Sequence, residues 1–408
     1  MFIQLFSMVF KGVLLGVFQP FFWLVFIFMF FQYRRSTQVQ EELYGKALYP
    51  FRDQVVDALL FSFLSGFIGS FIMVLLGVTI EGSGIEYVWL LALLFMLVHP
   101  RYICFSYAGG LLSLFSLITG YPHVDVAGLM ALVGILHLME SLLIWLDGYK
   151  SRVPIFTARD GGTVVGGFSL QRFWPIPFVI LAVSAGGTVQ GATSIPMPDW
   201  WPVIKPAIGV HASYMMVPAV AALGYGDISL TQTPEVHTKG SAFRLMAFSV
   251  ILTTLAVLAA SYHPLKWIAA VFAPVAHEYL IYYGQKIEKE GKPAFAPAMG
   301  GVKVLDVFPD SPAKAMGLKS GDTILKINNE PVRSDEDIVN ILGKYLTFIW
   351  MEVKDLDGNI RTVEYSDFRN GIDSLGIIFV PSNPLMSFSI EEMHGLLKRL
   401  FKRFFNKR

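Results

Sequence analysis

Long apolar segments dominate this chain and constrain its fold more than any other feature. They lie at roughly 12–32, 55–79, 86–99, 102–120, 127–147, 174–194, 206–224, 243–262 and 265–283. A helix needs about 20 mostly apolar residues to cross a bilayer. Only 15% of the 408 residues are charged, against about 25% in soluble domains. Residues 1–284 are therefore predicted to form a polytopic, all-α bundle of membrane helices.

The number of spans is predicted to be about eight, within a range of about seven to nine. Segment 86–99 is short, and Pro100 separates it from segment 102–120, so these two also fit one re-entrant hairpin. The apolar stretch from Val13 to Phe31 is too long for a cleavable signal peptide and lacks a small-residue exit. We expect it to stay as a helix.

Basic residues mark alternate loops between the apolar segments. They are Arg34, Arg35, Lys46, Arg52, Lys150, Arg152, Arg159, Arg172, Lys239 and Arg244. The intervening loops EGSGIE and YPHVDV contain neither Lys nor Arg. Cytoplasmic loops carry an excess of Lys and Arg. The basic loops and the polar tail of the chain are therefore predicted to be cytoplasmic.

The composition changes abruptly after Tyr283. Residues 285–299 are a charged linker with Pro, Gly and Ala, and residues 300–384 are predicted to be a small α+β domain. The stretches GVKVLDVF and DTILKINN alternate as half-buried strands do, and Asp357-Gly358 is typical of a hairpin turn. Ser334 with Asp337 three residues later predicts the start of a short helix.

The stretch DSPAKAMGLKSGDTILKINNEPV (310–332) carries the most specific motif. It matches the pattern S-P-A-x-x-A-G-L-x-x-G-D-x-I-x-x-I-N at Ser311, Pro312, Ala313, Gly317, Leu318, Gly321, Asp322, Ile324 and Asn328, with Met316 at a usual alanine. On these residues the domain resembles bacterial PDZ domains. The stretch SLGIIFVP comes last, which resembles the circularly permuted bacterial type.

The resemblance implies a peptide-binding groove, because PDZ domains bind a peptide as an added strand at a sheet edge. Its residues would be Leu375, Gly376, Ile377 and Phe379 on a strand, with Ile338 and Leu342 on a helix. Alternation and i, i+4 spacing predict ordinary core equally well. Ser374 replaces the first glycine of the family's Gly-Leu-Gly-Phe turn, so an internal segment or a folded partner fits as well as a carboxyl terminus.

A second motif, His277-Glu278, begins like a zinc-protease helix but does not continue as one. The site-2 metalloproteases need H-E-x-x-H, and Ile281 stands at the second ligand position. A set of His137, Glu140 and His277 would be unprecedented, so a degenerate metalloprotease is the weakest alternative. A His137–Glu140 hydrogen bond is the favoured interpretation of that pair. We predict no catalytic residues, no metal and no cofactor. Cys104, the one cysteine, cannot form an internal disulfide.

Two further segments indicate surfaces. The glycine-rich loop 155–175 lacks the Gly-Lys-Ser/Thr ending of a phosphate loop, and Asp160-Gly161 predicts a cytoplasmic hairpin. Residues 387–408 predict a basic amphipathic helix that lies on the anionic leaflet, with a partner groove as the alternative. Its surface residues would include Lys398, Arg399, Lys402, Arg403, Phe401 and Phe404.

A polytopic membrane part, one C-terminal PDZ domain and no catalytic set describe a membrane-anchored adaptor. This layout is similar to the MinJ-like cell-division topological determinants. The resemblance implies enrichment at septa and poles, where the protein would bridge a DivIVA-like polar scaffold to MinD and thereby to MinC, with other divisome proteins as further partners. A PDZ-regulated transporter or enzyme accessory is the main alternative. The net charge of +1 gives no sign of a nucleic-acid partner.

Overall fold

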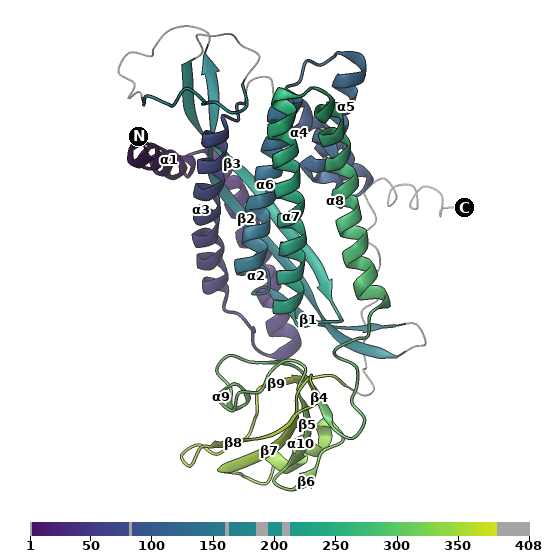
Figure 1. Cartoon of the computed structure of the whole chain (residues 1–408). Helices are drawn as coiled ribbons and strands as arrows, with labels where there is room; N and C mark the ends of the chain where they lie inside the picture. Colours follow the sequence, from purple (N-terminus) through teal and green to yellow (C-terminus); the bar gives the residue numbers. More distant parts are fainter. Residues whose placement is uncertain (1, 81–83, 160–162, 185–194, 206–212, 382–408) are drawn as a thin grey trace, which may run out of the picture.

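The computed structural model describes residues 2–80, 84–159, 163–184, 195–205 and 213–381. A tall helical part stands above a small domain (Figure 1). Its helices are α1 (Phe2–Gly16), α2 (Pro20–Tyr44), α3 (Phe51–Leu76), α4 (Ile85–Val98), α5 (Phe105–Thr119), α6 (Val126–Asp147), α7 (Pro234–Ser261) and α8 (Pro264–Glu290), with a 3-10 turn at Pro100–Ile103. Neighbouring contacts join α3 to α6, α6 to α7 and α7 to α8.

The prediction of an all-α membrane part is wrong. Strands β2 (Val164–Ser184) and β3 (Ser213–Ser229) occupy much of the predicted spans 174–194 and 206–224. With β1 (Arg152–Ala158) they form an antiparallel sheet in the order β1-β2-β3. The β1–β2 pair confirms a hairpin within 155–175, although its turn at 160–162 lies outside the described residues.

Beyond Leu170, where its pairing with β1 ends, strand β2 has one edge that faces the helical part, and groups of that part satisfy the backbone of this edge. Phe173 N donates to Tyr33 Oη at 3.2 Å, Val179 N to Ser70 Oγ at 2.7 Å, and Leu181 N to Val78 O at 3.3 Å. Odd-numbered residues therefore point their N–H groups away from β3. Pro175 and Pro177 share this parity and have no N–H to satisfy. Unpaired backbone groups are costly at membrane depth, so these prolines suit a strand among apolar helices.

Three described helices are long and apolar enough to cross a membrane: α3, α6 and α7. The pair α1 and α2, bent by 64° at its break, would give a fourth. Large apolar side chains such as Phe28 (56% exposed) and Leu90 (60% exposed) point outward from the helices. These features indicate membrane association. They do not confirm the predicted number of about eight spans.

A buried ion pair joins the end of α6 to β2. Arg172 and Asp147 are both fully buried and pair through their side chains, and Trp174 Nε1 donates to the same Asp147 oxygen at 2.9 Å. Arg172 also donates to Ser151 Oγ at 2.8 Å and lies over the Tyr33 ring. Arg172 is thus a core residue, and its assignment to a basic loop was wrong.

The small domain has the predicted α+β composition. Its elements are β4 (Val302–Val307), α9 (Pro312–Ala315), β5 (Thr323–Ile327), β6 (Glu330–Pro331), α10 (Asp335–Leu342), β7 (Phe348–Lys354), β8 (Ile360–Ser366) and β9 (Ile377–Phe379). The sheet order is β8-β7-β5-β4-β9, with β6 on β5. Ser334 and Asp337 form the predicted capping box of α10, and β7 and β8 pair across the Asp357-Gly358 turn.

Candidate functional site

Strand β9 forms one edge of the small domain's sheet. It pairs with β4 on one side, where Gly376 O accepts from Phe308 N at 3.0 Å and Val380 N donates to Lys303 O at 2.9 Å. Even-numbered residues therefore direct their backbone groups toward β4. The N–H and C=O groups of Ile377 and Phe379 point to the outer edge, which has no strand partner among the described residues. A peptide strand can add at such an edge.

The structure places five of the six predicted groove residues in or against one apolar cluster of the small domain. Ile338, Leu342 and Leu375 are buried in the core of the small domain, and Ile377 and Phe379 pack against the same cluster while staying partly exposed. Gly376 lies between Leu375 and Ile377. These contacts fit an ordinary core as well as a groove, so the peptide-binding groove stays a prediction, with Ile377 and Phe379 as its accessible part.

Gly376 is required by the backbone geometry of this turn. Its φ is +67°, and a Cβ atom at this position would lie 2.4 Å from Ser311 Cβ. Its N–H already faces Ser374 Oγ at 3.3 Å. The Gly376 N–H therefore has a hydrogen-bond partner within the turn itself.

The opposite face of β9 packs against the membrane part. Ile378, Val380 and Leu305 share an apolar cluster with Phe168 and Leu170 of β2, joined by Leu48 and Phe295. Arg152 of β1 also donates to buried Asp306 of β4 at 2.6 Å. The edge strand that could bind a peptide is therefore fixed between the small domain's core and the membrane part.

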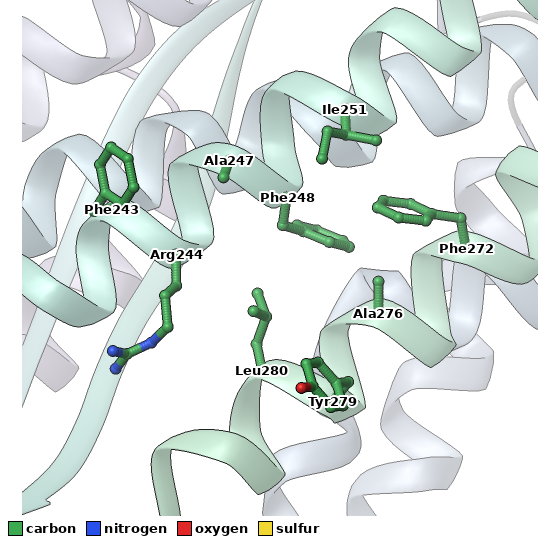
Figure 2. Close-up of a pocket in the computed structure, with 9 residues that line it drawn as sticks. All are labelled: Phe243, Arg244, Ala247, Phe248, Ile251, Phe272, Ala276, Tyr279 and Leu280. Atoms are coloured by element: carbon green, nitrogen blue, oxygen red, sulfur yellow. The ribbon is translucent and has the colours of Figure 1, made fainter. Parts of the chain in front are cut away.

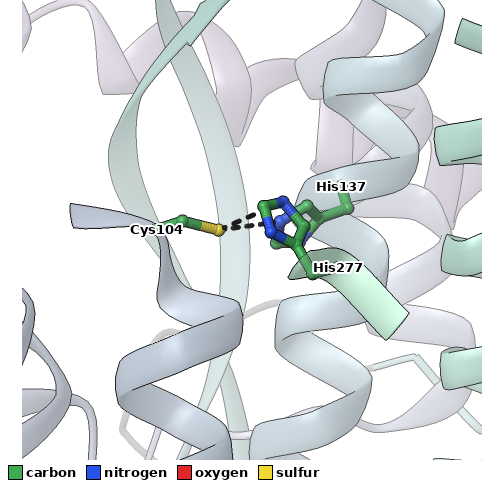
Figure 3. Close-up of side chains that lie close together, drawn as sticks. All are labelled: Cys104, His137 and His277. Carbon is green, nitrogen blue, oxygen red and sulfur yellow. Dashed lines mark hydrogen bonds between the residues drawn. The ribbon is translucent and has the colours of Figure 1, made fainter. Parts of the chain in front are cut away.

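The polar residues of the helices do not pair as predicted. His137 Nδ1 lies 2.8 Å from Val133 O, and its Nε2 lies 3.1 Å from Cys104 Sγ. These contacts replace the expected His137–Glu140 hydrogen bond. His277 Nε2 also approaches Cys104 Sγ, at 3.6 Å (Figure 3). Sequence reasoning missed Cys104, because an apolar run gives no signal of a polar contact 33 residues away.

Glu278 does not face this trio directly. Its Oε1 accepts from Arg101 Nη2 at 2.8 Å and its Oε2 from Tyr107 Oη at 2.6 Å. The nearby cavity of about 250 Å³ between α7 and α8 is apolar (Figure 2). The residues that line it are Phe243, Arg244, Ala247, Phe248, Ile251, Phe272, Ala276, Tyr279 and Leu280. A transport cavity built on His137 and Glu140 would be lined by both residues, and neither of them lines this cavity.

The predicted membrane-surface helix at 387–408 lies outside the described residues, including Lys398, Arg399, Lys402, Arg403, Phe401 and Phe404. It stays a prediction.

The comparisons with known proteins match the small domain and, at lower identity, a larger part of the chain. A family model described as PDZ domain matches residues 303–344. The cell division topological determinant MinJ of Bacillus subtilis (strain 168) is 24% identical over 250 residues, which cover 61% of this chain and 60% of that protein. The chain thus spans less than two thirds of the length of that curated relative.

A second relative matches a shorter region at higher identity. The probable cell division topological determinant MinJ of Lacticaseibacillus paracasei is 31% identical over 81 residues, covering 20% of this chain and 22% of that protein. Residues 303–344 of the small domain thus match the PDZ domain family, and over 61% of its length the chain is similar to a cell division topological determinant named MinJ.

Proposed function

We propose that this protein is a membrane-anchored, non-enzymatic adaptor of cell division that recruits partners through its PDZ domain. The observation that carries the proposal is the outer edge of β9. Its backbone groups at Ile377 and Phe379 have no strand partner among the described residues, and both side chains are partly exposed. The similarity to relatives named for cell division supports the process in which this edge would act.

The membrane part would serve as the anchor, crossing the bilayer several times. The long apolar helices α3, α6 and α7 support this, and the basic residues of the loops favour a cytoplasmic PDZ domain. The basic helix at 387–408 would add contact with the anionic leaflet. Confinement to a surface raises the local concentration of each recruited partner.

The finer proposal concerns the partners themselves. The adaptor would bridge a DivIVA-like polar scaffold to MinD, and through MinD to MinC, so that septum placement near the poles is restrained. It would accordingly be enriched at septa and poles. Because Ser374 occupies the Gly376 N–H, we favour an internal segment of a partner over a free carboxyl terminus as the ligand at β9.

A double substitution of the groove tests this function. Ile377→Ala with Phe379→Ala truncates the two partly exposed apolar side chains of β9 and leaves Ile378 and Val380 on the opposite face. The matched control is Ile360→Ala, which removes a 64% exposed side chain from β8 at the other end of the sheet. Tagged full-length protein would be captured from dividing host cells, and the MinD and DivIVA homologues would be quantified.

The proposal predicts that the groove variant loses at least one of these partners while the control retains both. Membrane levels of the two variants should be equal. If the groove variant retains both partners at wild-type levels, the assignment of β9 as the binding edge is wrong. If the wild-type protein captures neither partner, the adaptor function itself is wrong.

A further inference from the structure

Cys104, His137 and His277 converge from three separate helical elements. Cys104 caps the N-terminus of α5, His137 lies in the middle of α6, and His277 lies in α8 (Figure 3). The sulfur and the imidazole nitrogens that these residues offer all lie within 4.8 Å of one another. In the described part of the chain, they form the one group of three or more His, Cys, Asp or Glu residues with this property.

The separations of the ligand atoms fit a metal ion. Zinc binds sulfur at about 2.3 Å and nitrogen at about 2.0–2.1 Å, so a tetrahedral ion places these two atoms about 3.5 Å apart. Cys104 Sγ lies 3.1 Å from His137 Nε2 and 3.6 Å from His277 Nε2. One bound ion could therefore contact all three atoms after a small adjustment of one side chain.

The surroundings of His137 prepare it as a ligand. Its Nδ1 lies 2.8 Å from Val133 O, which can only accept a hydrogen bond. Nδ1 therefore carries the proton, and Nε2 presents its lone pair toward Cys104. Metal-binding histidines usually donate their second N–H in this way, because the bond fixes the ring and its tautomer.

Aromatic rings surround the two imidazoles of the trio. The Phe248 ring contacts both imidazole rings, with centroids 5.4 Å from His137 and 5.7 Å from His277. On another side the Tyr107 ring contacts His277 at 5.3 Å, and its hydroxyl donates to the carboxylate of Glu278. Phe248 therefore forms an apolar wall beside the two imidazoles, and the charge of Glu278 is already balanced by Arg101.

We infer that Cys104, His137 and His277 bind a transition-metal ion of the zinc class. A thiolate with two imidazoles is a ligand set that Zn²⁺ prefers over Mg²⁺ or Ca²⁺. The fourth position is open to water or to another ligand. Binding releases the thiol proton of Cys104. The ion would join α5, α6 and α8, and α8 leads directly into the linker of the PDZ domain.

Full-length protein purified in detergent, without chelators and after growth with added zinc, tests the inference. We expect about one zinc ion per chain by elemental analysis, as a single site requires. Cys104→Ser, His137→Ala and His277→Ala should each lower zinc affinity at least about tenfold, since each removes a ligand. Control variants are His123→Ala and His263→Ala, whose side chains are exposed; both should retain wild-type zinc content.

Replacing zinc with Co²⁺ gives absorption bands that report directly on the ligands of the ion, so it separates the loss of a ligand from a folding defect. Wild-type protein loaded with Co²⁺ should show near-ultraviolet thiolate-to-cobalt absorption and visible bands of a four-coordinate ion. Cys104→Ser should lose the near-ultraviolet absorption and, because serine keeps the size of the side chain, still elute as the wild-type protein does. If wild-type zinc content equals that of Cys104→Ser or His277→Ala, the trio is a chain of hydrogen bonds and the inference is wrong.

Discussion

At the scale of single residues, Arg172 is the charged side chain of the membrane part whose burial most needs a compensating partner. It is a fully buried guanidinium whose partner Asp147 is also fully buried. Removing one member of such a pair leaves an uncompensated buried charge, which costs about 3–5 kcal/mol. We predict that Arg172→Ala lowers the unfolding temperature of the detergent-solubilised protein by many degrees, measured by tryptophan fluorescence.

Arg35→Ala is the matched control for this change, because Arg35 is exposed on α2. It should leave the unfolding temperature close to that of the wild-type protein. Equal, small shifts for the two variants would show that the Arg172–Asp147 pair contributes little.

Single residues also show the limit of what the sequence could predict. Gly317 and Gly321, which the PDZ motif supplies, have φ of +76° and +93°, a backbone region that favours glycine. Such local requirements are visible because neighbouring residues impose them. The contact of Cys104 with His277 joins positions 173 residues apart. Nothing in the local spacing indicates that contact, because it depends on how three helices pack.

At the scale of elements, β2 depends on side chains of the surrounding helices to satisfy its free edge. Tyr33 Oη donates to Phe173 O at 2.7 Å and accepts from Phe173 N at 3.2 Å. Tyr33→Phe keeps the ring and leaves both backbone groups unpaired, so we expect it to lower the free energy of unfolding by about 1–3 kcal/mol. Denaturant unfolding followed by circular dichroism measures the change.

The control for this prediction is Tyr282→Phe, because the Tyr282 side chain is 58% exposed on α8. It should change the free energy of unfolding little. A Tyr33→Phe protein as stable as the control would mean that water or lipid headgroups satisfy this edge of β2 instead.

The C-terminal end of α8 carries a polar cluster with a predictable pH dependence. Burial opposes ionisation of the Glu288 carboxyl, but hydrogen bonds from His237, Leu230 N and Thr231 outweigh it and hold its pKa below the usual value. A depressed folded-state pKa contributes stability above the unfolded pKa of about 4.3. That contribution is lost as the pH falls through the folded-state pKa.

We therefore predict that Glu288→Gln lowers the unfolding temperature at pH 7 and that its difference from wild type shrinks as the pH falls below about 4. Thermal unfolding of both proteins at pH values from about 3 to 7 measures this difference, because a carboxyl group changes its protonation within that range. Glu290→Gln is the control, since that side chain is 67% exposed. A difference that is constant across the series would mean that the charge of Glu288 does not contribute.

The elements divide clearly into those the sequence predicted and those it did not. The capping box of α10 and the β7–β8 hairpin were predicted correctly, because caps and turns have local signatures. The segments 174–194 and 206–224 were predicted as helices because of their length and apolar character. A strand packed on both faces is equally apolar. Pro175 and Pro177 were the local sign that the first of them is not a helix.

At the scale of the whole molecule, the PDZ domain and the membrane part meet through β4 and β9. Arg152 supplies the charged contact to Asp306, and Ile378 and Val380 supply part of the apolar one. Arg152→Ala should loosen this docking without touching the PDZ core, because Arg152 belongs to β1. We predict faster limited proteolysis within the linker at 285–299, monitored by mass spectrometry of the full-length protein in detergent.

Lys46→Ala serves as the control for docking, since Lys46 is exposed in the loop after α2. Limited proteolysis should cleave the linker of the Lys46→Ala protein at the same rate as that of the wild-type protein. Equal cleavage rates for Arg152→Ala and Lys46→Ala would show that the apolar cluster alone holds the PDZ domain in place.

At this scale we propose that the protein is a membrane-anchored adaptor which acts in cell division through the outer edge of β9. Fluorescence microscopy of tagged full-length protein in dividing host cells tests it most directly. We predict that the wild-type protein and Ile360→Ala are enriched at septa and poles, and that Ile377→Ala with Phe379→Ala is spread evenly over the membrane at the same level. An even distribution of the wild-type protein would contradict the claim.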